Sequence, residues 1–424
     1  MQTESLGIAV RVAIVVVLIL PGIGLLSSEV TRPSVRFDPA STGSVPTLRA
    51  PQLDLSSSGT GCLSVVATID VGSNPFGLAY DSGKNEIFVA NAASNNVSVI
   101  DGASNKVVAD ISGYLGQIVG PYGIAYDRGK GEVFVTSEFS NGVDVINDTT
   151  NTVVGPISVG ASPSGLVYDS GKGEVFAENS GSHNVSVIND TSNKVVANLN
   201  VGNAPVAAAY DSAKGEVFVM NSGSGNVSVI SDTSNSVIST ISGFGSPYSA
   251  AYDRGKGEVF VADEGSGNVS VISDTNNTVI ANVSGGFSPD AIAYDSGDGE
   301  VFVGTQGSGT AGSVRVISDT NDTVIATVSV SSYVFGVASD VLSGEVYASD
   351  FYDSAVSVIA SCKSYSSPSA SSGLSMTDWI VIAAVIAAAA GGTTALVTRS
   401  RRRRGSAALS TKRPAPPVSP PKRM

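Results

Sequence analysis

One motif recurs along the chain and constrains the fold more than any other feature. Its best copy is Tyr168-Asp-Ser-Gly-Lys-Gly-Glu-Val-Phe-Ala-Glu-Asn179. Seven copies occur, and the Asp near the start of each is Asp81, Asp127, Asp169, Asp211, Asp253, Asp295 or Asp340. A period near 42 residues, made of short apolar runs and turn residues without a helical pattern, is typical of a four-stranded propeller blade. The sequence therefore predicts an all-β, seven-bladed β-propeller.

The third repeat shows how four strands fit into one period. Ser164–Tyr168, Glu174–Ala177, Val185–Ile188 and Val195–Leu199 are the expected strands, in that order. The turn between the first two, Asp169 to Gly173, superficially resembles a calcium loop. It lacks the alternating oxygen ligands of such loops and recurs in nearly every repeat, so we expect a structural turn.

The two ends of the repeat region predict how the ring closes. Leu63 to Ile69 matches the fourth-strand pattern but has no blade before it, whereas the last repeat, Phe335 to Ile359, stops after its third strand. We therefore expect the N-terminal strand to complete the seventh blade, which removes the open edges of a linear array.

The two cysteines, Cys62 and Cys362, fall at this closure. They align with Ser104 and Ala103, neighbours in the hairpin turn of the first repeat. Since no backbone turn joins these strands in the closing blade, a disulfide between the cysteines is expected, provided that the domain is exported to an oxidising compartment.

Charge and hydrophobicity divide the chain between compartments. From residue 28 to residue 375 there are 35 acidic and 14 basic residues, which argues against a nucleic-acid partner. Val12 to Leu26 is almost entirely apolar and predicts a signal peptide or signal anchor. Trp379 to Val397 is 19 uncharged residues followed by a cluster of five arginines, which predicts a membrane span with a cytoplasmic tail.

These features predict six segments. They are a signal peptide or anchor (1–27), a flexible linker rich in Ser, Thr, Pro and Gly (28–61), the propeller (62–362), a Ser-rich stalk (363–375), a transmembrane helix (376–398) and a basic, Pro-rich cytoplasmic tail (399–424). The predicted location is the cell membrane, with a single pass at the C-terminus and the propeller outside the cell.

Variation between repeats gathers on one set of loops, those from fourth to first strand and from second to third strand. The segments 113–120 and 307–312 are longer than their counterparts. Aromatic and acidic residues on these loops form the candidate ligand face: Phe76, Tyr114, Tyr122, Glu138, Phe139, Tyr248, Glu264, Phe287, Asp290, Tyr333, Phe351 and Tyr352. Asp263, Asp350 and Asp353 lie on the same loops. Such a surface could bind sugars, a cationic peptide or Ca²⁺, although no cofactor is specifically expected.

Catalytic and metal-ligating residues are not assigned. The single histidine, His183, stands where sister repeats have Asn or Gly, so a turn with left-handed backbone is expected there. One histidine and two paired cysteines do not make a usual zinc, copper or haem site. An exported domain would offer its sequons for glycosylation, at Asn96, Asn147, Asn184, Asn189, Asn226, Asn268, Asn276, Asn282 and Asn321.

The second-strand tetrapeptides also resemble the signature of the YVTN family of β-propeller repeats. They include Phe88-Val-Ala-Asn91, Phe134-Val-Thr-Ser137, Phe218-Val-Met-Asn221 and Phe260-Val-Ala-Asp263. The resemblance spans residues 63–360, with Phe in place of the family's Tyr. It implies a seven-bladed ring and a role like that of archaeal or bacterial surface-layer and cell-surface proteins, and it implies no catalytic residues.

The function expected from the sequence is therefore a membrane-anchored extracellular propeller that acts in binding, adhesion or envelope structure. Its partner would be an extracellular protein or glycan. The alternative is an extracellular hydrolase or lyase that uses carboxylates near the central channel.

Overall fold

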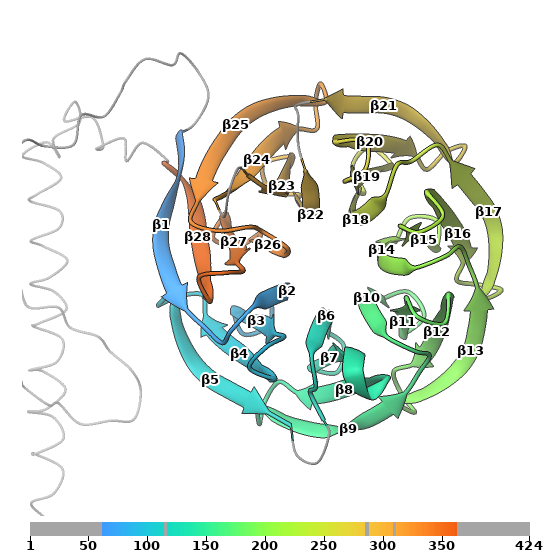
Figure 1. Ribbon diagram of the computed structural model, residues 1–424, viewed down its shortest axis with the longest axis horizontal. Helices are drawn as coiled ribbons and strands as arrows, with labels where there is room; N and C mark the ends of the chain where they lie inside the picture. Colours follow the sequence, from blue (N-terminus) through green and yellow to red (C-terminus); the bar gives the residue numbers. More distant parts are fainter. Residues whose placement is uncertain (1–61, 114–116, 285–287, 308–310, 363–424) are drawn as a thin grey trace, which may run out of the picture. The chain divides into compact units, whose positions relative to one another are not determined.

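The computed structural model describes residues 62–113, 117–284, 288–307 and 311–362. Within this part of the chain, seven antiparallel four-stranded sheets surround a common axis (Figure 1). Each sheet is one blade, and blades 1 to 6 follow the chain from the axis outwards. The predicted all-β, seven-bladed propeller is confirmed. The four strands predicted for the third repeat are also confirmed, each two residues longer than expected.

The innermost strands, from blade 1 to blade 7, are β2 (Pro75–Asp81), β6 (Pro121–Asp127), β10 (Pro163–Asp169), β14 (Pro205–Asp211), β18 (Pro247–Asp253), β22 (Pro289–Asp295) and β26 (Val337–Asp340). The second strands are β3 (Glu86–Asn91), β7 (Glu132–Ser137), β11 (Glu174–Asn179), β15 (Glu216–Asn221), β19 (Glu258–Asp263), β23 (Glu300–Gln306) and β27 (Glu345–Asp350). A short 3₁₀ helix, η1 (Glu138–Ser140), follows β7.

The third strands are β4 (Asn96–Asp101), β8 (Gly142–Asn147), β12 (Asn184–Asn189), β16 (Asn226–Ser231), β20 (Asn268–Ser273), β24 (Gly312–Ser318) and β28 (Ala355–Cys362). The outermost strands are β5 (Lys106–Ser112), β9 (Thr152–Ser158), β13 (Lys194–Asn200), β17 (Ser236–Ser242), β21 (Thr278–Ser284), β25 (Thr323–Val330) and, in blade 7, β1 (Cys62–Asp70).

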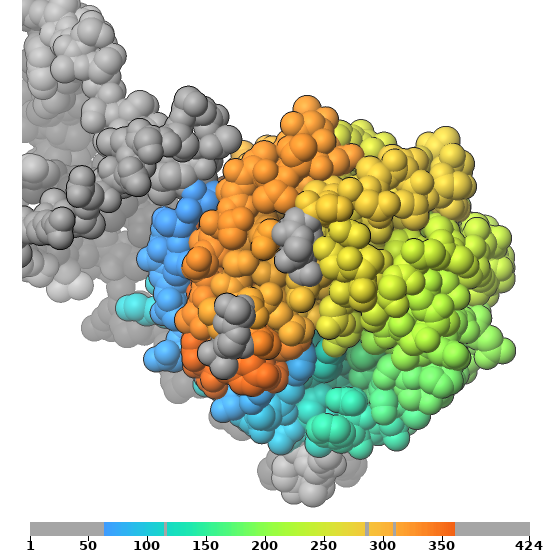
Figure 2. All heavy atoms as spheres, turned by 45° about the horizontal axis from the view of Figure 1, so that its top comes forward, coloured from blue at the N-terminus to red at the C-terminus, as the bar shows by residue number. Residues whose placement is uncertain are grey.

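Blade 7 is built from both ends of the ring, in the order β1-β28-β27-β26. The N-terminal strand β1 runs antiparallel to β28 from the Cys62–Cys362 pair to the Asp70–Ala355 pair. The blue residues of β1 accordingly lie against the orange residues of the last blade (Figure 2). The predicted closure by the N-terminal strand is confirmed, so the ring has no open end.

The second strands form the core of each blade. Their central residues are buried on both faces because each sheet is packed between two neighbours. A fully buried aromatic side chain recurs in most of these strands: Phe88, Phe134, Phe176, Phe218, Phe260 and Tyr347. Phe88, for example, packs against Val133 and Val135 of the next blade. The repeated Phe of the motif is therefore the contact that joins successive blades.

The outermost strands carry a β-bulge, which exposes an apolar residue in six of the seven blades. In blade 1 the pairing of β4 with β5 skips Val108, which is 53% exposed. Val66, Val154, Val196, Ile238 and Ile280 are exposed at the corresponding positions. A bulge bends an edge strand and disturbs its free hydrogen-bonding groups, so it hinders edge-to-edge pairing between molecules.

The repeated Asp-Ser-Gly-Lys-Gly turn is structural, as predicted. Asp169 is fully buried, and its Oδ1 accepts hydrogen bonds from the backbone N–H groups of Gly171 and Lys172. Gly173 has φ +68°, and a Cβ there would lie 2.6 Å from a carboxylate oxygen of Asp190. Only glycine fits this position without strain.

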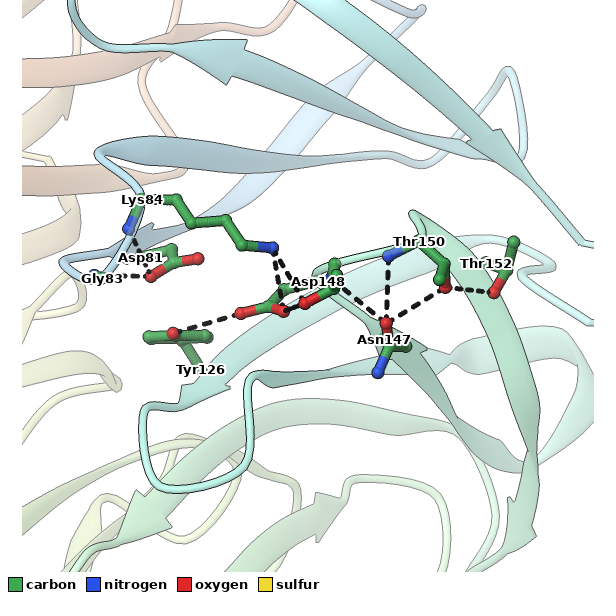
Figure 3. A network of polar contacts seen from close by, with 9 residues as sticks. Asp81, Gly83, Lys84, Tyr126, Asn147, Asp148, Thr150 and Thr152 are labelled. Carbon is green, nitrogen blue, oxygen red and sulfur yellow. Dashed lines mark hydrogen bonds and ion pairs between the residues drawn. The ribbon is translucent and has the colours of Figure 1, made fainter. Parts of the chain in front are cut away.

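The lysine of this turn ties one blade to the next, as Figure 3 shows for blades 1 and 2. Lys84 of blade 1 reaches Asp148 of blade 2, with 2.9 Å between Nζ and Oδ1. The Tyr126 hydroxyl donates to the other oxygen of Asp148 at 3.3 Å. Burial, together with the nearby carboxylates of Asp81 and Asp148, raises the pKa of Tyr126 far above its usual value. Lysine, tyrosine and two aspartates thus form one network across the seam.

Lysines and aspartates occur together at five of the seven seams. Lys84, Lys130, Lys172, Lys214 and Lys256 precede the blades that carry Asp148, Asp190, Asp232, Asp274 and Asp319. At the two seams of blade 7, Asp298 and Ser343 replace the lysine, and Ser361 and Gly102 replace the aspartate. Blade 7 also has Ser339 where the other blades have tyrosine. The closing blade therefore lacks the ionic part of the seam.

Several predictions from the sequence fall outside the described residues. These are the signal peptide or anchor, the linker, the stalk, the transmembrane helix and the cytoplasmic tail. Among the described residues, no helix is long and apolar enough to cross a membrane. The side chains of Cys62 and Cys362 also lie outside the described part, so the disulfide stays a prediction, although the backbone places the two residues opposite each other.

Replacing Lys84 by Met should destabilise the propeller by about 1 kcal/mol, because Asp148 is buried and would lose its cation. Burial alone would raise the pKa of Asp148, but hydrogen bonds from Lys84 and Thr149 hold it below its usual value. The contribution is therefore complete at neutral pH and is lost as the pH falls through the folded-state pKa.

Urea denaturation at pH 7 and pH 2 measures this effect. The difference between wild type and Lys84→Met should be present at pH 7 and smaller at pH 2. Lys106→Met, a change of the same kind at an exposed residue of β5, is the control and should have no effect. Equal stability of wild type and Lys84→Met at pH 7 would contradict the proposed role of the seam.

The Cys62–Cys362 disulfide can be tested by peptide mass spectrometry of the unreduced protein. We expect one linked peptide that contains both residues, because the register of β1 and β28 pairs them directly. On the chain-entropy estimate, closing a loop of roughly 300 residues contributes about 5 kcal/mol, so Cys62→Ser should lower the melting temperature of the oxidised protein but not of the reduced one. Recovery of unlinked Cys62 peptide would show the prediction to be wrong.

Candidate functional site

The loops predicted to share one face do so. The loop from β1 to β2 contacts the loop from β3 to β4, because Ala92 and Ala93 donate backbone hydrogen bonds to Asn74 and Ser73. The corresponding loops of blade 3 are joined in the same way. We call this side of the ring, where the fourth-to-first and second-to-third loops meet, the top face.

In blades 1 to 6, the second residue of the inner strand lies at the top mouth of the central channel. The proline that begins six of these strands has no N–H to leave unpaired, which suits the start of a strand. The residues that follow the prolines are Phe76, Tyr122, Ser164, Val206, Tyr248 and Asp290, and Phe335 takes this position in blade 7. Below them is a cavity of ≈ 280 Å³, the upper chamber, whose lining includes Tyr122, Tyr248, Asp290 and Phe335.

Six aromatic rings from blades 7, 1 and 2 pack together beside this mouth. Phe76 is central, with its ring centroid 4.1 Å from that of Tyr122, 5.1 Å from Phe335 and 4.9 Å from Phe351. Tyr352 continues the group from Phe351 and is 56% exposed. We call Phe76, Tyr122, Tyr333, Phe335, Phe351 and Tyr352 the aromatic cluster. It runs without a break from the chamber to the surface.

A hydrogen bond crosses the mouth between blades 2 and 5. The hydroxyl oxygens of Tyr122 and Tyr248 are 2.6 Å apart, although 126 residues separate them in the sequence. Burial raises the pKa of both tyrosines, and the charges of Glu138 and Asp290 raise them further. Both hydroxyls therefore stay protonated at physiological pH and serve as neutral donors and acceptors.

Asp290 is the carboxylate that lines the upper chamber. It is 3% exposed, and its Oδ1 accepts a hydrogen bond of 3.1 Å from the Gln306 side chain. Its Oδ2 has no partner among the described residues. Burial raises the pKa of Asp290 to about 7, with a further contribution from Glu264, while the bond from Gln306 opposes the shift. The group therefore titrates near neutral pH.

A second buried carboxyl, Glu178 of β11, lies behind the chamber wall. It is fully buried, and neither side-chain oxygen has a partner among the described residues. A Cβ on Gly165, which lines the chamber, would come within 2.7 Å of Glu178 Oε2. Burial raises the pKa of Glu178 to about 8. In blade 2 this position is Thr136, whose hydroxyl is satisfied by Gly123 N–H and the Ser164 carbonyl.

The other predicted face residues separate into three groups. Glu138 and Phe139 are in η1, where Phe139 is 74% exposed, and Glu264 is in the turn after β19. Tyr114 and Phe287 lie outside the described residues. Asp263 and Asp350 are structural: Asp263 accepts from the backbone of Gly245 and Ser246, and Asp350 accepts from Ser357.

Sequence reasoning missed Phe335 and the Tyr122–Tyr248 pair. Phe335 could have been found, because Phe335-Gly336 repeats Phe76-Gly77 of blade 1. The tyrosine pair carries no sequence signal. Sequence reasoning also missed Asp144, which stands where five of the other six third strands have serine. Asp144 accepts a hydrogen bond of 2.7 Å from the N–H of Ile118 in the long segment 117–120.

His183 occupies a left-handed turn, as predicted, with φ 56°. Its Nδ1 accepts a hydrogen bond from the N–H of Ala204 at 3.0 Å. Asn95 and Asn141 have the same backbone conformation in their blades and accept equivalent bonds from Gly120 and Ser162. His183 therefore has the same structural role in its turn as Asn95 and Asn141 have in theirs. This role accounts for the histidine without a catalytic function, in line with the interpretation from the sequence.

The asparagines of the nine sequons differ in solvent exposure. The asparagines at Asn276, Asn282 and Asn321 are exposed. The other six, at Asn96, Asn147, Asn184, Asn189, Asn226 and Asn268, are partly buried, and several use their side chains within turns or strands. If the chain is glycosylated, the exposed three are the accessible acceptors.

The bottom mouth of the channel holds a second cavity, of ≈ 570 Å³, lined by Tyr168, Tyr210, Tyr252, Tyr294 and Arg254 among others. These tyrosine hydroxyls are already bonded to the seam aspartates. In the part of the chain that the structure describes, no three His, Cys, Asp or Glu residues are grouped so that they could hold a metal ion.

Comparison with solved structures finds the same fold in the hydrazine synthase of Kuenenia stuttgartiensis. The match has a TM-score of 0.60 and 17% sequence identity, and it covers 68% of this chain and 96% of that chain. At this identity the likeness shows a propeller fold alone. No family model matches the chain, and no curated protein matches it either. The YVTN and surface-layer assignment therefore stays a prediction.

Glu178 should make the propeller less stable as the pH rises. Its folded-state pKa of about 8 lies above the ordinary value of 4.5, so the folded chain holds a proton that the unfolded chain releases. Stability is full below about pH 4.5 and is lost up to about pH 8, by roughly 1.4 kcal/mol per pH unit at most. Glu178→Gln should flatten this decline.

Thermal and urea unfolding between pH 5 and pH 8 will measure the slope for wild type and Glu178→Gln. Asp353→Asn removes an exposed carboxylate and should leave the slope unchanged. An identical slope in wild type and Glu178→Gln would mean that Glu178 finds a compensating partner.

Proposed function

We propose that this chain is a membrane-anchored extracellular binding module, acting in adhesion or envelope structure, that contacts its partner through the top face. The propeller fold is consistent with a binding or structural module. The observation that carries the proposal is the aromatic cluster, which reaches from the upper chamber to the exposed Tyr352. Aromatic side chains offer large contact areas at little conformational cost and dominate many binding surfaces.

Charge favours a cationic partner over a neutral one. Residues 62–362 contain 32 acidic and 10 basic residues, which gives a net charge of −22. Glu138, Glu264 and Asp290 act electrostatically on the tyrosines of the channel mouth, so the negative field extends to the site. A surface of this kind attracts basic partners and accelerates their association. Of the two expected partner classes, an extracellular protein with a basic surface fits better than a glycan.

The membrane anchor and the extracellular location rest on the apolar and arginine-rich pattern after residue 376. The alternative function, an extracellular hydrolase or lyase, would need a second carboxylate that acts together with Asp290. Glu178 is the other strongly perturbed carboxyl beside the chamber, but it lies behind the wall and does not line the cavity. Binding is therefore the function that the geometry supports better.

Arrays of extracellular proteins and glycans, probed with the full chain, test the proposal. Tyr352→Ala should weaken binding at least tenfold, because it removes the exposed end of the aromatic cluster. Leu342→Ala is the matched control: Leu342 is 71% exposed but lies in the turn between β26 and β27, on the opposite face. Equal loss in both variants, or loss in neither, would contradict a top-face site.

A further inference from the structure

Asp290 is not required by the fold. The other blades place Phe76, Tyr122, Ser164, Val206 and Tyr248 at the same position, so the scaffold accepts apolar and aromatic residues there. Unlike Asp263, which accepts hydrogen bonds from backbone N–H groups, Asp290 accepts one from the side chain of Gln306. Its buried Oδ2 has none among the described residues. Because the fold does not require a carboxylate at this position and one of its oxygens has no partner in the described part of the chain, we look for the role of Asp290 in binding.

The surroundings of this carboxylate suit a cation. None of the residues that line the upper chamber is basic, so no side chain of the chamber can neutralise Asp290. The rings of Tyr122, Tyr248 and Phe335 line the same cavity. Aromatic faces attract ammonium groups, and a buried carboxylate without a partner is unfavourable until a counter-ion reaches it.

The cavity also limits the size of the ligand. At ≈ 280 Å³, the chamber is at the lower end of the range for ligand pockets, so it fits a side chain or a small molecule and no folded element. The Tyr122–Tyr248 hydrogen bond crosses its mouth. Breaking one neutral hydrogen bond costs only about 1 kcal/mol net, which a desolvated ion pair can offset.

We propose that the upper chamber receives the ammonium group of a lysine-type side chain from the bound partner, with Asp290 as its counter-ion. The inference rests on the proposed function, because the partner is the basic protein that the top face attracts. The aromatic cluster would contact the partner's surface outside the chamber, and Asp290 would select for a basic residue at the centre of that surface.

Isothermal titration calorimetry of the full chain with n-butylammonium, a mimic of the lysine side chain, tests the site. At pH 8 Asp290 is mostly ionised, since its pKa is about 7, and the neighbouring Tyr122 and Tyr248 remain neutral. We expect saturable binding of one n-butylammonium per chain and at least tenfold weaker binding of n-butanol, which has the same shape without the charge. Absence of saturable binding, or equal binding of n-butanol, would overturn the proposal.

Two variants test whether the carboxylate of Asp290 is the group that binds n-butylammonium. Asp290→Asn and Asp290→Ser, the second copied from blade 3, should each weaken n-butylammonium binding at least tenfold while the melting temperature stays within a few degrees. Asp353→Asn makes the same charge change at an exposed top-face residue and should bind within twofold of wild type. Equal weakening by Asp353→Asn would indicate a diffuse charge effect and overturn the role of Asp290.

The experiments distinguish failure of the ammonium site from failure of the proposed top-face function. If the ammonium site is wrong, Tyr352→Ala still weakens partner binding whereas Asp290→Asn does not. If the proposed top-face function is wrong, n-butylammonium still binds the chamber in a manner that depends on Asp290, but neither variant changes partner binding.

Discussion

The pairing of β1 with β28 is the interaction on which the rest of the ring depends. Each blade buries both faces of its sheet only because it has a neighbour on either side. Without β1, blade 7 would lose its outermost strand and leave β28 with an unpaired edge. The closure joins strands almost 300 residues apart in the sequence, so its loop-closure entropy is the largest of all the strand pairings in the domain.

The distribution of seam contacts agrees with this view of blade 7. The lysine and the aspartate are both present in the sequence at the five seams between blades 1 and 6, and both are missing at the two seams of the closing blade. At three of the five seams they form an ion pair, whereas Lys172 and Lys256 pair with Glu174 and Glu258 of their own blades. A seam thus has either both the lysine and the aspartate or neither of them. This is expected if a buried aspartate without a nearby lysine destabilises the folded chain. Blade 7 relies instead on the backbone pairing of β1 with β28, on Tyr347, whose hydroxyl donates to Asn105 of blade 1, and on its side of the aromatic cluster.

The same asymmetry positions the candidate site. Blades 7, 1 and 2 supply the aromatic cluster, whereas blades 5 and 6 supply Tyr248 and Asp290. A propeller brings the second residue of every inner strand to one small circle, so residues from distant repeats meet at the mouth without any loop rearrangement. The repeated residues build the blades, and the residues of the candidate site are those that differ from one repeat to the next.

Repetition is the reason that the sequence by itself determined so much. Seven copies of one motif specify the strand order, the blade number, the turn chemistry of Asp169 and His183, and the completion of blade 7 by residues 63–69, because these depend on local patterns that repeat. The candidate face was also predicted, since loop connectivity alone assigns loops to faces. Only the tertiary structure decided which of those residues meet. The Tyr122–Tyr248 bond, the unpartnered oxygen of Asp290 and the burial of Glu178 arise from ring curvature and side-chain packing across the axis, which leave no periodic trace in the sequence.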